Sequence, residues 1–195
     1  MRFGALVRRV TVGILDDPLC LPVAKRFTEW NTFMEGNVDF LLKDSALHTR
    51  SHCMRVLLLA LMIGNACKLK DDDLDALAAM AVFHDSRRES DMLDHGHGKR
   101  AAEYYKAFCA RNSFPVFDER VYAVISQHDC DDKIGVAECK KLGQNCVDLY
   151  LVFKDADGLD RLRLGSKMLD PSMLRTKAAV DLIPFAQKLL KASKS

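Results

Sequence analysis

Apolar residues recur at helical spacing in two consecutive segments of the first half of the chain. Between Ser51 and Leu69 they fall three or four positions apart, which places them on one face of a helix. The acidic run from Asp71 to Asp73 follows, and it provides an N-cap and a favourable first turn for a second helix. The apolar pattern carries this second helix to His84. The pattern therefore predicts a pair of long helices joined by a short turn.

Further helices are predicted on both sides of this pair. One begins after the N-terminal prolines and runs through Trp30, and another begins at Ser172 and is broken or restarted at Pro184. The others are expected at residues 37–42, 99–110, 118–128 and 147–164. The segment 86–98 is polar and contains two glycines, so it is expected to be a loop. No segment alternates convincingly between apolar and polar residues, so the predicted fold class is all-α, a helical bundle.

The composition agrees with a single helical domain. A chain of 195 residues with 49% hydrophobic and 29% charged residues can form a full hydrophobic core, which excludes a disordered or fibrous protein. Glycine and proline together account for only 15 residues (10 and 5), so few positions break a helix. We expect one domain over residues 1–195, with an N-terminal helical arm over 1–44 and C-terminal helices over 172–193.

Net charge, apolar runs and cysteine content limit the cellular location and the kinds of partner that we expect for the protein. The net charge of +2 gives no reason to expect a nucleic-acid polymer as partner. The longest strongly apolar run, Val56 to Ile63, is too short to span a membrane, and no export signal is recognisable. The seven cysteines are odd in number and form no CxxC pair, and Cys53 and Cys67 lie within apolar helical patterns. We expect reduced thiols, a cytoplasmic location and no membrane partner.

Polar residues that could bind a metal stand at the ends of apolar helices. His84 and Asp85 follow one apolar run, Asp157 lies within another, and His52 opens a third. A buried carboxylate is costly unless it is paired, hydrogen-bonded or bound to a cation. Two imidazoles and two carboxylates suit a divalent ion such as Zn, Fe, Mn, Co or Ni. Such an ion would support hydrolysis of a phosphate ester, because it activates water and polarises a phosphoryl oxygen.

Three segments carry a resemblance to a known family. They are HTRSHCMRV at 48–56, MAVFHDSRR at 80–88 and DADGLDRLR at 155–163. In this order they resemble the ligand-bearing helices of the HD-domain metal-dependent phosphohydrolase superfamily, over a core of about residues 45–165. The resemblance implies an HD-domain helical bundle with a divalent metal, Mg included, and a metal-binding set of His52, His84, Asp85 and Asp157. It selects His52 rather than His48 as ligand, and Asp157 rather than Asp155.

Two more histidines determine whether the predicted metal site could hold one ion or two. His97 stands before Gly98 at the start of a predicted helix, and His128 ends another, as in members of the superfamily that hold two ions bridged by the aspartate of the His-Asp pair. Both the one-ion and the two-ion site stay open at this point. In a one-ion site, His97 and His128 would face the substrate phosphate. Asp91 and Asp94 lie in the same polar loop and could orient imidazoles or hold the loop.

The resemblance also implies catalytic and substrate-binding roles. His84 and Asp85 would be the catalytic pair. Arg88, Lys99 and Arg100 flank the polar loop and are the candidates to bind a phosphate, with Arg55 and Arg161 as weaker ones. We expect the partner to be a small-molecule phosphate ester or nucleotide, and a homo-oligomer is compatible with the sequence. The alternative is a catalytically silent HD module that binds a nucleotide or a protein.

Overall fold

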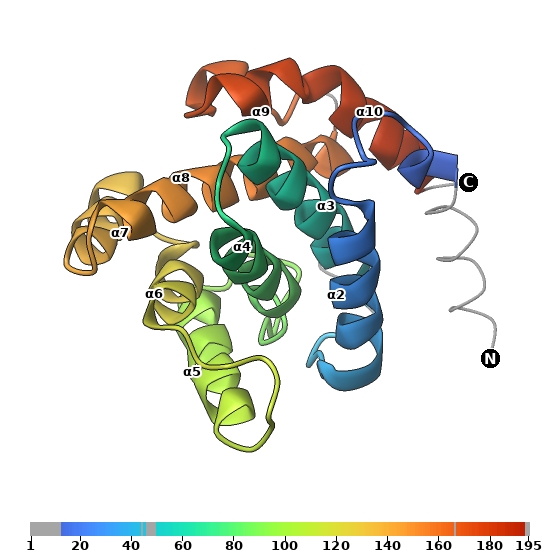
Figure 1. Ribbon diagram of the computed structural model, residues 1–195. Helices are drawn as coiled ribbons and strands as arrows, with labels where there is room; N and C mark the ends of the chain where they lie inside the picture. Colours follow the sequence, from blue (N-terminus) through green and yellow to red (C-terminus); the bar gives the residue numbers. More distant parts are fainter. Residues whose placement is uncertain (1–12, 44, 46–49, 166, 194–195) are drawn as a thin grey trace.

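The computed structural model describes residues 13–43, 45, 50–165 and 167–193, and within these ranges it contains helices and no strand (Figure 1). The all-α prediction is confirmed. The α-helices are α2 Ala24–Asn37, α3 Arg50–Ala66, α4 Asp71–Phe83, α5 His97–Cys109, α6 Glu119–Gln127, α7 Asp132–Lys140, α8 Gln144–Leu159, α9 Lys177–Asp181 and α10 Ile183–Ala192. Two short 3-10 helices, η1 Asp160–Leu164 and η2 Pro171–Met173, follow α8.

Helices α3 and α4 form the centre of the bundle and are almost entirely buried. Helix α3 is shorter than the predicted 51–69, because Lys68 adopts a positive φ of 58°, which a continuing helix does not allow. Cys67 therefore lies beyond the helix and is exposed, whereas Cys53 is buried as expected. No cysteine of the described chain forms a disulfide. The prediction of α4 with the acidic run in its first turn is confirmed, but the N-cap is Lys70, without a side-chain hydrogen bond, rather than an aspartate.

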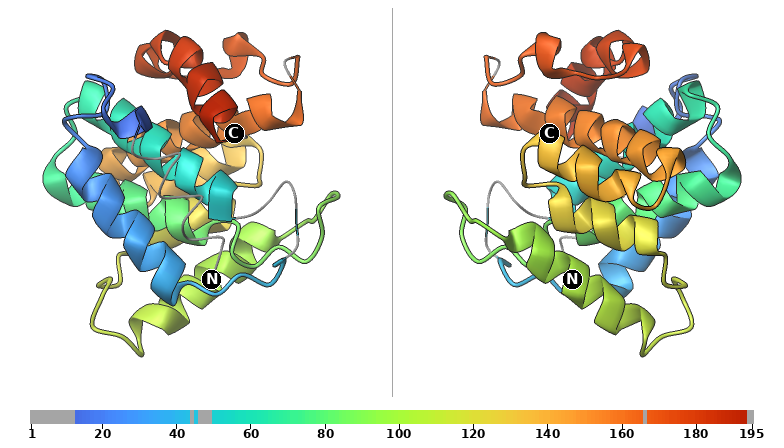
Figure 2. Two further views of the ribbon diagram at one scale, coloured as in Figure 1. Left: turned by 90° about the vertical axis from the view of Figure 1, so that its right-hand side faces the viewer. Right: turned by 90° about the vertical axis from the view of Figure 1, so that its left-hand side faces the viewer.

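The remaining helices surround this central pair. Helix α2 packs against α3 and α4 on one flank, and α8 packs against α3 on another. Helices α9 and α10 lie across the top of the bundle in Figure 1, and Pro184 occupies the first turn of α10, where it is tolerated. The segment between α4 and α5 extends from the bundle as a long loop in both views of Figure 2. Among the described helices, none combines the length and apolar character needed to cross a bilayer.

One predicted helix does not form, one helix was not predicted, and the helix expected from Ser172 begins only at Lys177, after the 3-10 helix η2. No helix forms at 37–42, because the backbone there bonds to other parts of the fold: Arg50 donates to the carbonyl of Val38, and the Leu41 amide donates to the carbonyl of Ser86. Helix α7 is not among the predicted helices. Asp131 is in fact its N-cap and accepts a hydrogen bond from the Lys133 amide.

Candidate metal centre

The six predicted metal ligands converge on one place between five helices. Five of them are buried, and Asp157 has a side chain that is 30% exposed. They are His52 in α3, His84 and Asp85 at the end of α4, His97 at the start of α5, His128 at the end of α6 and Asp157 in α8. We call these six residues the His/Asp cluster. Gly96, at a φ of 79°, is the N-cap that sets the direction of α5 and thereby the position of His97.

One half of the cluster is formed by His52, His84 and one oxygen of Asp85. The Nε2 atoms of the two imidazoles lie 3.2 Å apart. Asp85 Oδ2 lies 3.5 Å from Nε2 of His52 and 3.9 Å from Nε2 of His84. Asp157 adds Oδ1, which lies 3.3 Å from Nε2 of His52. The donor atoms of His52, His84 and Asp85 are close enough to share one metal ion.

The other half is formed by His97, His128 and the second oxygen of Asp85. The Nε2 atoms of His97 and His128 lie 2.9 Å apart. Asp85 Oδ1 lies 3.2 Å from Nε2 of His97 and 3.7 Å from Nε2 of His128. This second group could also hold an ion, and both groups include the carboxylate of Asp85.

The opposite ring nitrogen of each histidine is engaged by the protein. His84 and His128 end their helices, and each Nδ1 lies within hydrogen-bond distance of a carbonyl oxygen in the last turn of its own helix. The Nδ1 contacts are His84 with the carbonyl of Ala81 at 2.9 Å, His128 with that of Ile125 at 2.7 Å, His97 with that of Asp94 at 2.7 Å, and His52 with the carboxylate of Asp160 at 2.7 Å.

These contacts determine what the cluster can bind. A carbonyl or carboxylate oxygen can only accept, so each neutral imidazole carries its proton on Nδ1 and turns a lone pair on Nε2 into the cluster. Lone pairs that face each other at 2.9 and 3.2 Å repel unless a cation lies between them. The protein thus presents imidazole nitrogens in the form that binds a metal, and the residues present fit a divalent ion.

Burial and neighbouring carboxylates shift the pKa values of the histidines in opposite directions. Burial lowers the pKa of His84 to about 3, so this side chain is neutral at neutral pH. Burial also acts to lower the pKa of His52, but its hydrogen bonds with Asp157 and Asp160 outweigh this effect and leave the pKa raised. The pKa of His97 is likewise raised, because Asp85 outweighs burial. Bound protons at these two positions would compete with a metal ion.

Asp160 is a functional residue that sequence reasoning missed. It is 3% exposed, accepts the proton of His52 and also accepts two hydrogen bonds from Arg55, at 2.6 and 2.9 Å. Arg55 is therefore not available to bind a phosphate, which corrects the prediction for that residue. Asp160 lies three positions after Asp157, and this spacing on a helical segment was the signal that could have indicated a shared face.

The cluster opens to solvent through a cavity of about 430 Å³, which we call the cluster cavity. Asp85, His97, His128 and Asp157 all line it, and so do Arg88, Lys154, Arg161 and Arg163. Lys154 was not predicted, although it precedes Asp157 by three positions on α8. Its Nζ donates to the carbonyls of His128 and Cys130, at 2.8 and 3.2 Å, which holds the side chain beside the cluster.

Two of the predicted phosphate-binding residues do not line the cluster cavity. Lys99 is exposed on α5, and the guanidinium of Arg100 donates to the Asp94 carboxylate at 2.6 Å, so Arg100 fixes the loop instead. Arg88 does line the cavity, and its Nη1 lies 3.9 Å from Asp85 Oδ1. Asp91 accepts a hydrogen bond from Ser45, which also serves to hold the loop.

The two residues that the resemblance did not select are His48 and Asp155. His48 lies outside the described residues, and His95, a further histidine of the loop, is exposed. Asp155 is fully buried but faces away from the cluster, where it accepts hydrogen bonds from the backbone amides of Arg175 and Thr176.

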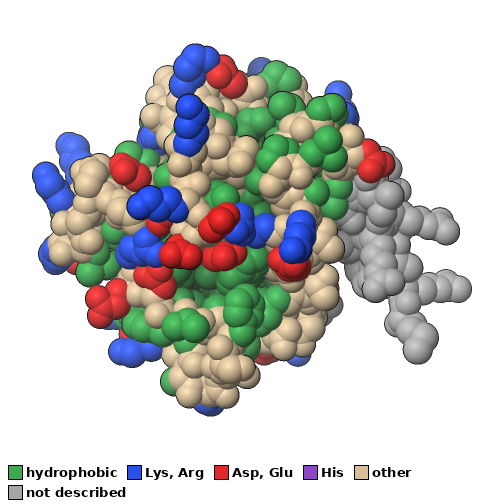
Figure 3. Space-filling model, in the orientation of Figure 1, with side chains coloured by type: hydrophobic (Ala, Val, Ile, Leu, Met, Phe, Trp, Pro, Cys, Tyr) green, Lys and Arg blue, Asp and Glu red, His purple; other side chains and the backbone are tan. Residues whose placement is uncertain are grey.

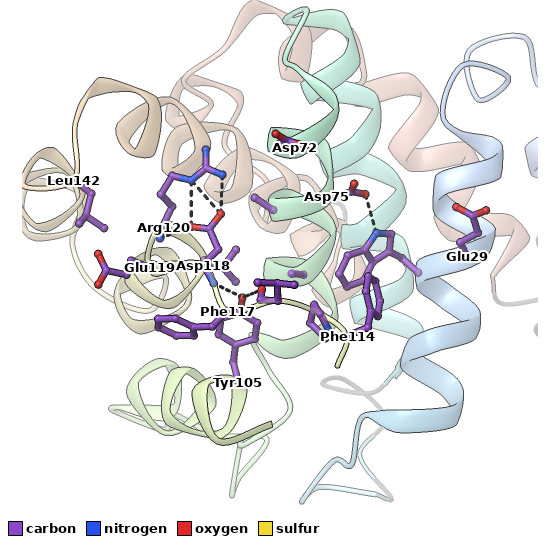
Figure 4. A pocket seen from close by; sticks show the side chains of 16 residues that line it. Glu29, Asp72, Asp75, Tyr105, Phe114, Phe117, Asp118, Glu119, Arg120 and Leu142 are labelled. Atoms are coloured by element: carbon purple, nitrogen blue, oxygen red, sulfur yellow. Dashed lines mark hydrogen bonds and ion pairs between the residues drawn. The ribbon is translucent and has the colours of Figure 1, made fainter. Parts of the chain in front are cut away.

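Another cavity, of about 910 Å³, shares no lining residue with the cluster (Figure 4). Acidic side chains border apolar ones over α4 and α6 on the face that Figure 3 presents. Two pairs of polar groups border this cavity: Trp30 Nε1 donates to Asp75, and Arg120 donates to Asp118. Its lining residues include no histidine and no cysteine.

The chain matches no protein-family model, no curated protein and no solved structure. What the structure itself provides is two buried groups of histidine and aspartate that could hold a metal ion.

Proposed function

We propose that the chain is a metal-dependent phosphohydrolase of the HD-domain superfamily, with two divalent ions at the His/Asp cluster. The observation that carries this proposal is the position of Asp85, which turns Oδ2 towards one histidine pair and Oδ1 towards the other. A carboxylate placed in this way suits a bridge between two ions. The order of the six residues along the chain, which resembles that of the superfamily, supports the same proposal.

The residues around the cluster have distinct roles in this proposal. Divalent ions held there would polarise phosphoryl oxygens and lower the pKa of water at the site. Arg88 and Lys154 line the cluster cavity and would donate hydrogen bonds to the phosphoryl group. Asp160 keeps the proton of His52 on Nδ1, so that Nε2 remains a ligand. The substrate is a small phosphate ester or nucleotide, either a monoester or a diester.

Chelation and reconstitution test the proposal. The protein is stripped with EDTA, reloaded with Mn²⁺, Co²⁺ or Zn²⁺, and assayed for release of p-nitrophenolate from p-nitrophenyl phosphate and from a p-nitrophenyl phosphodiester. We expect turnover that disappears on chelation, returns on reloading and is lost in Asp85→Ala. The matched control is Asp72→Ala, which removes an exposed carboxylate from the same helix and is expected to keep full activity.

Two results would contradict the proposal in different ways. A protein that binds metal with retained fold but hydrolyses no phosphate ester under these conditions would be a metal-stabilised binding module. A protein that binds no metal after reloading would show that the cluster is not a metal centre.

A further inference from the structure

A second cavity, of about 470 Å³, opens beside the cluster cavity. Both cavities are lined by Lys154, Asp157 and Arg161, so they meet at these three side chains. Asp157 belongs to the His/Asp cluster, and its carboxylate lies 3.3 Å from Nε2 of His52. A phosphoryl group held at the cluster would therefore have a cavity on each side of it.

One wall of the second cavity is apolar and accessible. It is formed by Met168, Leu169, Met173 and Leu174, in the segment after η1. Met168 is 45% and Met173 is 62% exposed, so their side chains are not covered by the rest of the protein. Flexible thioether side chains adapt well to the face of an aromatic ring.

The lining of the second cavity contains both negative and positive side chains, whose charges offset one another. Asp132 accepts a hydrogen bond from Arg175 at 2.7 Å and lies 3.7 Å from Lys154 Nζ. Asp170 accepts hydrogen bonds from the amide and hydroxyl of Ser172. The lining contains the carboxylates of Asp131, Asp132, Asp157 and Asp170 and the cations of Lys154, Arg161 and Arg175. This arrangement does not favour a second phosphate, and it suits an uncharged group.

We infer that the second cavity binds an uncharged aromatic substituent of the substrate, and that the substrate is consequently a phosphodiester with one substituent in each cavity. This inference rests on the proposed function. In the reaction, the oxygen of a water molecule bonds to phosphorus and the bond from phosphorus to one ester oxygen breaks. The proton from that water goes to the departing oxygen, so that a monoester and an alcohol are formed.

Gly158 gives a direct way to fill the second cavity. It lines this cavity from α8, and a Cβ at its position would lie 3.7 Å from Leu174 Cδ2, an ordinary contact. Alanine therefore fits there, whereas the longer side chain in Gly158→Leu would occupy the cavity. Met173→Trp fills the same cavity from the opposite wall and leaves α8 unchanged. Ile134→Trp, at an exposed position on α7 outside the lining, is the control for an added indole.

The experiment compares p-nitrophenyl phosphate with thymidine 5′-(p-nitrophenyl phosphate) on the Mn²⁺-loaded protein. We expect kcat/KM for the diester to exceed that for the monoester at least tenfold. Gly158→Leu and Met173→Trp should each lower the diester value at least tenfold and the monoester value clearly less, because the single p-nitrophenyl group of the monoester can still lie in the cluster cavity. Gly158→Ala and Ile134→Trp should change neither value more than twofold.

The outcomes separate this inference from the proposed function. Preference for the monoester, or filling variants that leave the diester value unchanged, would overturn the inference while the phosphohydrolase proposal stands. Equal losses on both substrates in both filling variants would also overturn it. Absence of metal-dependent hydrolysis of either ester would overturn the proposed function, and the inference with it.

Discussion

Replacing Asp160 with alanine is expected to lower both the stability of the protein and its affinity for metal. The carboxylate and the Arg55 guanidinium are 3% and 6% exposed, so the substitution leaves a positive charge buried without its partner. Removing one member of a buried ion pair costs about 3–5 kcal/mol of unfolding free energy. His52 also loses the acceptor for its Nδ1 proton. Loss of such a partner lowers metal affinity about 10–100-fold.

Urea denaturation of the metal-free protein and calorimetric titration with Mn²⁺ measure the two effects separately. The matched control, Asp148→Asn, changes an exposed carboxylate on α8, the helix that precedes Asp160, and should alter stability by less than about 0.5 kcal/mol. The double variant Arg55→Met/Asp160→Leu replaces the pair with apolar groups, so it should recover stability without recovering metal affinity. Asp160→Ala with a stability loss below about 1 kcal/mol and unchanged affinity would refute the reasoning.

The pH dependence of this effect follows from the pKa of Asp160. Burial acts to raise this pKa, but the hydrogen bonds from His52 and Arg55 outweigh burial and hold it below the ordinary value of 3.8. A carboxyl group with a lowered pKa in the folded state stabilises the protein fully above the pKa of the unfolded chain. The stability difference between wild type and Asp160→Ala should therefore be largest above about pH 4. It should shrink as the pH falls through the lowered value.

The remaining predictions concern packing and proton competition. Gly135→Ala should lower the unfolding free energy by about 1–3 kcal/mol, because its Cβ would overlap the Tyr150 side chain. The control is Gly36→Ala, which should not destabilise the protein, because nothing lies within 4 Å of the added Cβ. Equal effects of the two substitutions in urea denaturation would contradict this account. Metal affinity should weaken as the pH falls from 8 to about 5.5, because a proton on His97 competes with the metal ion. The Asp85 carboxylate outweighs burial and raises the pKa of His97, whereas His84, with a pKa of about 3, stays neutral over this range. Calorimetry in buffers of different ionisation enthalpy should show proton release on metal binding, and release of no protons near pH 6.5 would contradict the assignment.

The sequence predicted those features for which a residue has a single strong physical reason to occur at its position. His84 and Asp85 follow an unbroken apolar run in the second half of α4, and a polar pair in that position needs a partner, so these two residues could be singled out from their own segment. His97 and His128 were indicated only by the resemblance. The central helices were predictable because their apolar spacing is continuous. The start of α4 followed directly from its acidic first turn.

Other features depend on contacts between distant segments and could not be read locally. Asp160 matters because Arg55 and His52, on another helix, face it. Lys154 looks like a solvated lysine in sequence and is placed by carbonyls at the end of α6. The predicted helix at 37–42 failed because tertiary hydrogen bonds hold that backbone in a different conformation. In each of these cases, contacts between distant segments determine the conformation or the role of a residue, and the local sequence does not.

The most direct test of the central claim is the metal content of the purified, reconstituted protein, measured by elemental mass spectrometry beside the His128→Ala variant. The account predicts about two ions per chain and the loss of one in His128→Ala, because this histidine belongs to only one of the two groups that share Asp85. One ion per chain that His128→Ala leaves in place would contradict the dinuclear assignment. A chain that binds no ion after reconstitution would contradict the metal centre itself.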